Sequence, residues 1–308
     1  MINGLININK EEGFTSHDVV AKLRGILGQK KIGHTGTLDP GAKGVLPVCL
    51  GKATKLCDMI GSWDKTYRAT LLLGRETDTE DISGQVLRRE EVSLSGTGII
   101  GIISSFVGIY DQIPPMYSAK KVGGKKLYEL ARKGVEVERK PCRLLISDIR
   151  ILEIRLPYVE FEVTCSKGTY IRSLCRDIGR KAGCGGCMAS LIRTRVSDFS
   201  LEDAITLSHV ETLMKEGTLD SVIRPIDSLF PFYPSVYIKG EGRTLLMNGN
   251  SLALHYVDRE TGPDPASAIP EGMPERYRVY DQEGHFIGLY TGDEERGILS
   301  PDKLFFDL

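Results

Sequence analysis

A glycine-rich segment over residues 33–44 carries a single carboxylate, Asp39. Its glycines permit backbone conformations that other residues avoid and let a bulky ligand approach closely. Pro40 biases Asp39 toward an extended backbone. An aspartate is ionised at neutral pH unless it is desolvated, so Asp39 could act as a general base or as a nucleophile. The alternative is purely structural, because Asp-Pro-Gly is a common turn sequence.

The sequence does not match the motifs that bind nucleotide cofactors. Gly51-Lys52 follows a predicted strand, but Leu46 stands where a phosphate-binding loop needs glycine, and Ala53 where it needs serine or threonine. No GxGxxG follows a strand. Cys184 and Cys187 have the spacing of a metal knuckle, but no second pair follows to complete a zinc site. We therefore expect no cofactor and no metal.

The elements that must position Asp39 are mixed along the chain. Alternating and apolar runs predict strands, and a Thr15–Asp18 capping box opens a helix. Two further helices are predicted, of which the first ends near Gly183. The predicted strands are 4–8, 45–50, 66–73 and 159–165, and the predicted helices are 19–27, 169–181 and 206–216. There is no regular βαβ repeat, which favours an α+β fold with a mixed, largely antiparallel sheet. Prolines at 225, 231 and 234 indicate a linker, and 258–275 reads as a proline-rich loop.

Charge is distributed unevenly along a chain whose net charge is only −1. Residues 101–195 hold 18 Lys/Arg against 9 Asp/Glu, a local +9, whereas residues 201–308 hold 9 against 19, a local −10. A basic middle can attract phosphates even in a neutral chain, because screening confines charge effects to about 8–10 Å. The alternative is a solvated face without a partner.

The seven cysteines are odd in number, and several lie in apolar runs, which indicates reduced thiols and a cytoplasmic location. No run approaches the roughly 18–20 apolar residues of a membrane helix, and Met1 to Lys10 does not resemble a secretory signal.

Five ordered segments resemble the TruB family of RNA pseudouridine synthases. The loop that holds Asp39 carries the family's signature, and the other segments follow its order along the chain over residues 3 to about 200. The segments are Asn3-Gly4-Leu5 with Lys10, Gly13, Phe14, Thr15 and Ser16; Gly33 to Pro40 with Gly44-Val45-Leu46-Pro47; Lys65-Thr66-Tyr67; Gln112 to Lys120 with Gly124, Tyr128, Ala131, Arg132 and Gly134; and Lys167 to Leu174 with Leu191 to Arg195. The chain departs from the family pattern at Glu11-Glu12 and Lys43, which leave Asp39 in place.

The resemblance implies a pseudouridine synthase fold. Its catalytic domain would span 1–230, with an inserted thumb at about 110–145, and a small PUA-like β-barrel domain would span 235–308. The thumb stretch 116–143 carries nine Lys/Arg against three Asp/Glu, with Tyr117 and Tyr128 among them. Basic and aromatic side chains together fit the binding of an RNA loop.

The resemblance also implies the reaction and the residues that serve it. The family isomerises uridine to pseudouridine, here in the T-loop of tRNA at the position conventionally numbered 55, with Asp39 as the essential group. Arg172 would pair with Asp39, and Arg176 and Arg180 would face solvent or phosphate. Tyr67 would stack on the flipped base and His34 would fill the space it vacates, while Tyr170 and Leu191 would complete the pocket wall. Without the motifs, these would be core or loop residues.

The expected partner is the T-arm stem-loop of tRNA. No membrane and no obligatory protein partner are implied, and a monomer is expected. A second hypothesis is a non-catalytic RNA-binding or RNA-folding protein. A glycoside hydrolase is disfavoured, because no second acid accompanies Asp39 in the matched motifs.

Overall fold

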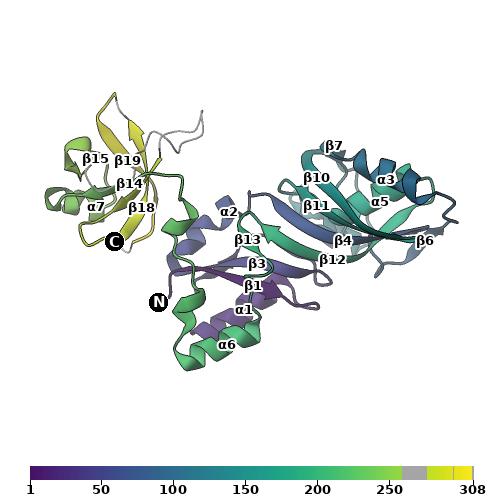
Figure 1. Cartoon of the computed structure of the whole chain (residues 1–308), viewed down its shortest axis with the longest axis horizontal. Coiled ribbons are helices and arrows are strands. Elements are labelled where there is room, and N and C mark those ends of the chain that lie inside the picture. The colour runs from purple at the N-terminus through teal and green to yellow at the C-terminus, as the bar shows by residue number, and fades with distance from the viewer. Residues whose placement is uncertain (259–275, 294, 307–308) are drawn as a thin grey trace.

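The computed structural model describes residues 1–258, 276–293 and 295–306. The proline-rich loop expected at 258–275 therefore lies outside the described residues except for Asp258. Within the described ranges the chain forms an elongated molecule, with a small barrel at one end and β6 (Val86–Arg89) near the other (Figure 1).

A nine-stranded sheet forms the body of the protein. Its main order is β1-β3-β12-β4-β11-β10-β7, with β2 paired to β3 and β13 paired to β12. All pairs are antiparallel except β3 with β12. The mixed, largely antiparallel sheet of an α+β fold is thus confirmed. The strands are β1 (Gly4–Lys10), β2 (Ile32–His34), β3 (Lys43–Leu50), β4 (Lys65–Leu73), β7 (Gly108–Gln112), β10 (Cys142–Arg155), β11 (Tyr158–Cys165), β12 (Gly186–Val196) and β13 (Phe199–Ser200).

Helices pack against this sheet at two places. α1 (Ser16–Leu27) and α6 (Leu207–Glu216) bury their apolar stripes against β1 and β3. α3 (Gly96–Ser104) and α5 (Ile171–Lys181) cover β4, β11 and β12. β11 alternates buried and half-buried residues as expected for a strand with one covered face. Short α2 (Cys57–Ile60) follows β3, and β5 (Arg75–Thr77) pairs with β6 (Val86–Arg89).

The expected capping box is present at the start of α1. The Thr15 hydroxyl accepts a hydrogen bond from the Asp18 amide, and the Asp18 carboxylate accepts one from the Thr15 amide. α5 begins at Ile171, two residues later than predicted, because Tyr170 keeps an extended backbone as the residue that precedes the helix.

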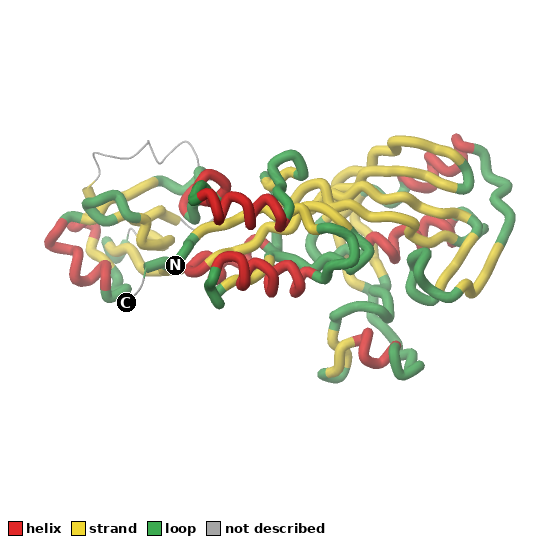
Figure 2. The backbone as a smooth tube through the Cα atoms, turned by 90° about the horizontal axis from the view of Figure 1, so that it is seen from below, coloured by secondary structure: helices red, strands yellow, loops and turns green. Residues whose placement is uncertain are grey.

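A small lobe projects from the sheet between β7 and β10. Figure 2 shows it as a short helix with short strands standing away from the body. It holds β8 (Lys121–Val122), β9 (Lys125–Lys126) and α4 (Leu127–Ala131), and β8 and β9 form a separate two-stranded sheet. Gln112 and Cys142, at the two ends of this insertion, are paired residues of β7 and β10.

The C-terminal strands form a six-stranded, nearly closed barrel with the order β15-β19-β18-β17-β14-β16. They are β14 (Ser235–Ile238), β15 (Leu252–Ala253), β16 (Val257–Asp258), β17 (Arg276–Tyr280), β18 (Phe286–Asp293) and β19 (Ile298–Leu304), with α7 (Arg243–Met247) beside them. Leu289 and Phe305 of the barrel pack in one apolar cluster with Leu5 and Val45 of the body. No described helix is both long and apolar enough to cross a membrane.

Candidate active site

Asp39 lies in the loop between β2 and β3, and its carboxylate is bound to α5. Asp39 Oδ2 lies 2.8 Å from Arg172 Nε, and the Asp39 side chain is 43% exposed whereas that of Arg172 is 6% exposed. Both terminal nitrogens of Arg172 are also bonded, since Nη1 donates to the Thr79 carbonyl at 3.1 Å and Nη2 to the Tyr117 carbonyl at 2.9 Å. The Arg172 guanidinium therefore fixes the carboxylate while leaving part of it accessible to a substrate.

Buried anchors hold the Asp39 loop from below. The Leu38 amide donates to Ser16 Oγ at 2.9 Å, and the Asp39 carbonyl accepts from the Ala42 amide. Lys10 is fully buried and donates from Nζ to the Phe14 carbonyl at 2.6 Å and to the Pro40 carbonyl at 3.3 Å. Burial lowers the pKa of Lys10 to about 8, against the opposing effect of nearby Asp39. The loop is thus held as one rigid unit.

Arg193 on β12 lies beneath the same loop. Its Nε donates to the Val45 carbonyl at 2.7 Å and its Nη2 to the Gly36 carbonyl at 3.2 Å. It lies directly opposite Tyr67 of β4 in the ladder, and its charge opposes the effect of burial on the pKa of Tyr67. Lys10 and Arg193 belong to the segments that resemble the family, but neither was among the expected site residues. Their place in the family motifs was the signal that could have pointed to them.

One ion pair and one apolar cluster connect four of the six expected site residues to the Asp39 loop. Asp39 and Arg172 form the ion pair, Tyr170 precedes Arg172, and Tyr67 and Leu191 lie on neighbouring strands in one apolar cluster with Leu38. Gln112 holds Tyr170 by its backbone, accepting from the amide at 2.8 Å and donating to the carbonyl at 2.9 Å. Burial raises the pKa of Tyr67, so its hydroxyl stays protonated at neutral pH.

His34 stands apart from that group. Its ring meets the ring of His17 edge-on, with centroids 5.0 Å apart, and no hydrogen bond, ion pair or ring contact joins it to the other five within the described structure. Its buried Nδ1 has no hydrogen-bond partner there. Burial, with His17 and Arg193 nearby, lowers the pKa of His34 to about 4, so the imidazole is neutral at pH 7.

Arg176 does not face solvent or phosphate, and that prediction was wrong. Its side chain is buried and pairs with buried Glu80, while its Nε donates to Asp177 at 2.8 Å. Ser173 donates to the second oxygen of Glu80 at 2.5 Å. Arg180 does extend outward, with its side chain 58% exposed and 3.4 Å from Glu76. Of the three arginines spaced four residues apart on α5, Arg172 and Arg176 are therefore buried and Arg180 is exposed.

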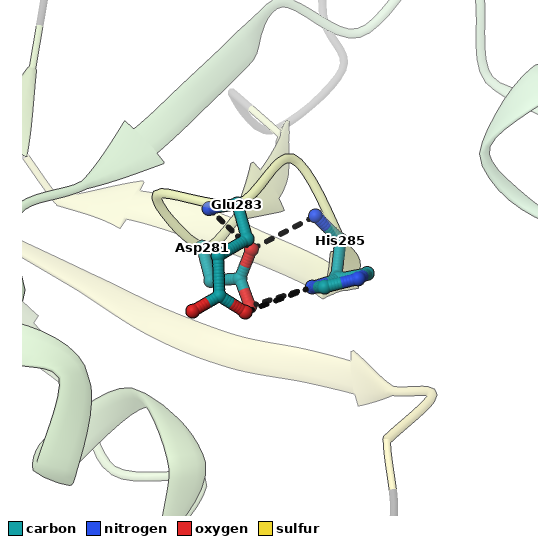
Figure 3. A group of neighbouring side chains, drawn as sticks. All are labelled: Asp281, Glu283 and His285. Carbon is teal, nitrogen blue, oxygen red and sulfur yellow. Dashed lines mark hydrogen bonds and ion pairs between the residues drawn. The ribbon is translucent and has the colours of Figure 1, made fainter.

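Two groups of described residues have side chains that could ligate a metal. Cys184 and Cys187 are both buried, and burial raises the pKa of Cys187 to about 11. In the barrel, Asp281, Glu283 and His285 cluster within 4.8 Å (Figure 3). Asp281 Oδ1 already accepts from the Glu283 and His285 amides, and Oδ2 faces His285 Nδ1 at 3.1 Å. These bonds stabilise the turn between β17 and β18.

Two surface hollows lie away from Asp39. One of about 430 Å³ is lined by residues that include Arg75, Arg89 and Leu156, and one of about 620 Å³ by residues that include Trp63, Thr164 and Arg195. Neither includes Asp39, whose carboxylate is reached directly from the surface beside Arg172.

Comparisons with known proteins agree with this fold and this loop. Residues 24–171 match the model of the TruB family pseudouridylate synthase N-terminal domain, and residues 172–231 match that of the tRNA pseudouridylate synthase B C-terminal domain. The chain is 51% identical to tRNA pseudouridine synthase B of Lachnoclostridium phytofermentans over 99% of this chain and 100% of that protein. It is 49% identical to the protein of the same name from Alkaliphilus oremlandii over 94% of this chain and 92% of that one.

Solved structures show the same architecture. A chain of an H/ACA RNP bound to a substrate RNA containing 2'-deoxyuridine matches with a TM-score of 0.70 and 26% identity, over 99% of this chain and 85% of that one. A chain of a Cbf5-Nop10-Gar1 complex matches with a TM-score of 0.71 and 27% identity, over 98% and 85%. Fold and site together thus define a pseudouridine synthase with a C-terminal barrel. More narrowly, the chain belongs to the TruB family.

Proposed function

We propose that this protein converts uridine to pseudouridine in tRNA, and that its target is the T-loop uridine conventionally numbered 55. The observation that carries the proposal is the partly exposed Asp39 carboxylate held by a buried arginine. The similarity to tRNA pseudouridine synthase B along nearly the whole chain supports tRNA as the substrate. The seven free cysteines fit a reducing cytoplasm.

The reaction is an isomerisation that needs no external group. The N1–C1′ bond breaks, uracil turns, C5 bonds to C1′, and the C5 proton is lost while N1 gains one. The proposed role of Asp39 is to act at the sugar or at the base, by attack on C1′, by attack on the base or by removal of a sugar proton. Arg172 would orient the carboxylate for that step through Nε.

Base flipping would bring the uridine to Asp39, because a stacked base cannot reach a carboxylate in the protein. Flipping costs a few kcal/mol. Tyr67 would stack on the extruded base, with Tyr170 and Leu191 as pocket walls, and the neutral imidazole of His34 would occupy the vacated space in the RNA. An aromatic ring of this kind can stack on RNA bases.

The thumb, residues 110–145, would contact the RNA. Its lysines at 121, 125 and 133 are exposed and make no ion pair within the described residues. Tyr128 lies under Lys126 and Arg132, which combines stacking surface with positive charge. We expect a stand-alone monomer that binds the T-arm stem-loop without a protein partner.

Tritium release tests the proposal directly. The wild-type chain, added alone to tRNA labelled with tritium at uridine C5, should release the label, and mass spectrometry should find the product at the T-loop. Asp39→Asn should release none and bind RNA within about threefold of wild type, since the two side chains have the same shape. The control Asp148→Asn removes an exposed carboxylate on β10 and should remain active.

Two outcomes would contradict the proposal in different ways. A wild-type chain that binds tRNA without turnover would indicate the non-catalytic RNA-binding alternative. Normal turnover by Asp39→Asn would remove Asp39 from the chemistry while leaving the enzyme class intact.

A further inference from the structure

Arg193 is the largest fully buried side chain in the described part of the protein, with 1% of its surface exposed. No carboxylate lies within ion-pair distance of it among the described residues. A buried charge without a counter-charge costs several kcal/mol unless other groups solvate it. The groups that solvate Arg193 therefore show what it holds in place.

Those groups lie on both sides of Asp39. The Gly36 carbonyl accepts from Nη2 and the Val45 carbonyl from Nε, so the guanidinium joins the two ends of the loop that carries the carboxylate. Arg193 packs directly against the start of the loop, because a Cβ built at Gly36 would lie 3.5 Å from Arg193 Nη1. Movement of Arg193 would open the loop at its base.

The backbone of Arg193 holds the end of the same loop, at Gly44. Arg193 pairs with Gly44 in the parallel contact between β12 and β3. Gly44 has a φ of 101°, and a Cβ there would lie 2.2 Å from the Arg193 carbonyl oxygen. Such an approach is possible only for glycine. The side chain and the backbone of Arg193 together thus fix the position of the Asp39 loop relative to the sheet.

Arg193 also lies directly opposite Tyr67 in the pairing of β12 with β4. Side chains of paired residues on adjacent strands lie within contact range of one another. One buried arginine therefore connects the loop of the essential carboxylate to the strand position of the residue proposed to stack on the flipped base. Buried Lys65, close by, donates instead to the Gly61 and Trp63 carbonyls and does not hold the loop.

We propose that Arg193 is a positioning residue for the isomerisation: it sets the placement of Asp39 relative to Tyr67 before RNA binds. This inference rests on the proposed function. It acts through Gly36, Val45 and Tyr67 and makes no contact with the substrate. A displacement of about 1 Å between groups that act on one substrate costs about a hundredfold in rate.

The test separates chemistry from binding in the full-length chain. Arg193→Lys keeps the charge but cannot hold the Gly36 and Val45 carbonyls with one planar fork, and Arg193→Met keeps the bulk without donors. Single-turnover release of tritium from C5-labelled tRNA should slow about a hundredfold in Arg193→Lys, with the RNA dissociation constant within threefold of wild type. Tyr67→Phe removes the hydroxyl of the residue paired with Arg193, and its effect should be less than additive with Arg193→Lys.

Two controls exclude trivial causes. Arg195→Lys changes an exposed arginine two residues along the same strand, whose guanidinium donates to Thr66 Oγ1, and should keep the wild-type rate. Ile103→Ala opens a cavity under α3 and lowers stability without removing any hydrogen bond of the Asp39 loop. It should keep its single-turnover rate at temperatures where it is folded. The single-turnover rate of Arg193→Met is measured in the same assay. If Arg193→Met does not fold, the rate of Arg193→Lys alone decides the outcome.

The inference is overturned if Arg193→Lys turns over within threefold of wild type, if its defect lies in RNA affinity, or if Ile103→Ala slows equally. Failure of the proposed function looks different, because then the wild-type chain itself releases no tritium.

Discussion

Arg172 connects the Asp39 carboxylate to two other segments through one guanidinium. Nε lies 2.8 Å from Asp39 Oδ2, Nη1 donates to the Thr79 carbonyl, and Nη2 donates to the Tyr117 carbonyl at the base of the thumb. The geometry of the carboxylate is therefore set by the loop before β6 and by the thumb as well as by α5. A change in any one of these segments would be transmitted to Asp39.

Arg172→Lys should slow single-turnover isomerisation about a hundredfold, because a lysine cannot bind Asp39 and two carbonyls in one plane. Rapid-quench measurement of tritium release at saturating tRNA checks this. Arg180→Lys, on the exposed side of the same helix, should be unchanged. Equal rates for the wild type and Arg172→Lys would show that the ion pair does not orient the catalytic group.

Glu80→Gln should lower the free energy of unfolding by about 3 kcal/mol, because it leaves the buried Arg176 without the full charge of its partner. Glu80 also has a φ of 66°, so its backbone is held in a conformation that non-glycine residues rarely adopt. Urea unfolding measures the loss. Glu211→Gln, which removes the exposed pair with Lys215, should cost less than about 0.5 kcal/mol. Similar losses in the two variants would contradict the structural role of Glu80.

His34 should make the protein less stable as pH falls from about 6.5 to about 4. Its pKa is about 4 in the folded protein against 6.5 in the unfolded chain. The unfolded chain thus binds more protons than the folded protein between these two pH values. The free energy of unfolding therefore decreases as the pH is lowered through this range. His34→Gln should remove about 1–2 kcal/mol of that fall, a figure reduced because the ring is only partly buried. Urea midpoints measured from pH 4 to 7 test this, and parallel curves for the two proteins would refute it.

Replacing the exposed thumb lysines with glutamine should weaken RNA binding chiefly at low salt. If each contacts one phosphate, the slope of log affinity against log salt should fall by about 2–3 units in the triple variant. Filter binding over a range of KCl concentrations measures it. The control triple variant removes the same charge from exposed lysines elsewhere and should keep the slope. The thumb lysines are 121, 125 and 133, and the control lysines are 30, 215 and 239.

Features that depend on neighbours in sequence were predicted from the sequence alone. The capping box of α1, the alternation of β11 and the end of α6 at Glu216 all follow from residues within a few positions of one another. The Asp39 loop was found because its signature is contiguous. Such signals persist whatever the rest of the chain does, since they arise from local backbone geometry and hydrophobic periodicity.

The tertiary structure alone decided which charged residues are buried. Arg176 meets Glu80 across 96 positions, and Arg193 meets Val45 across 148. A bulge in the pairing of β12 with β4 separates Arg193, opposite Tyr67, from Arg195, opposite Thr66, so only one of them lies beneath the loop. Sequence pattern assigns arginines to the surface by default, because an isolated charge is costly to bury. That cost is offset here by carbonyl and carboxylate partners that only the folded chain brings within reach.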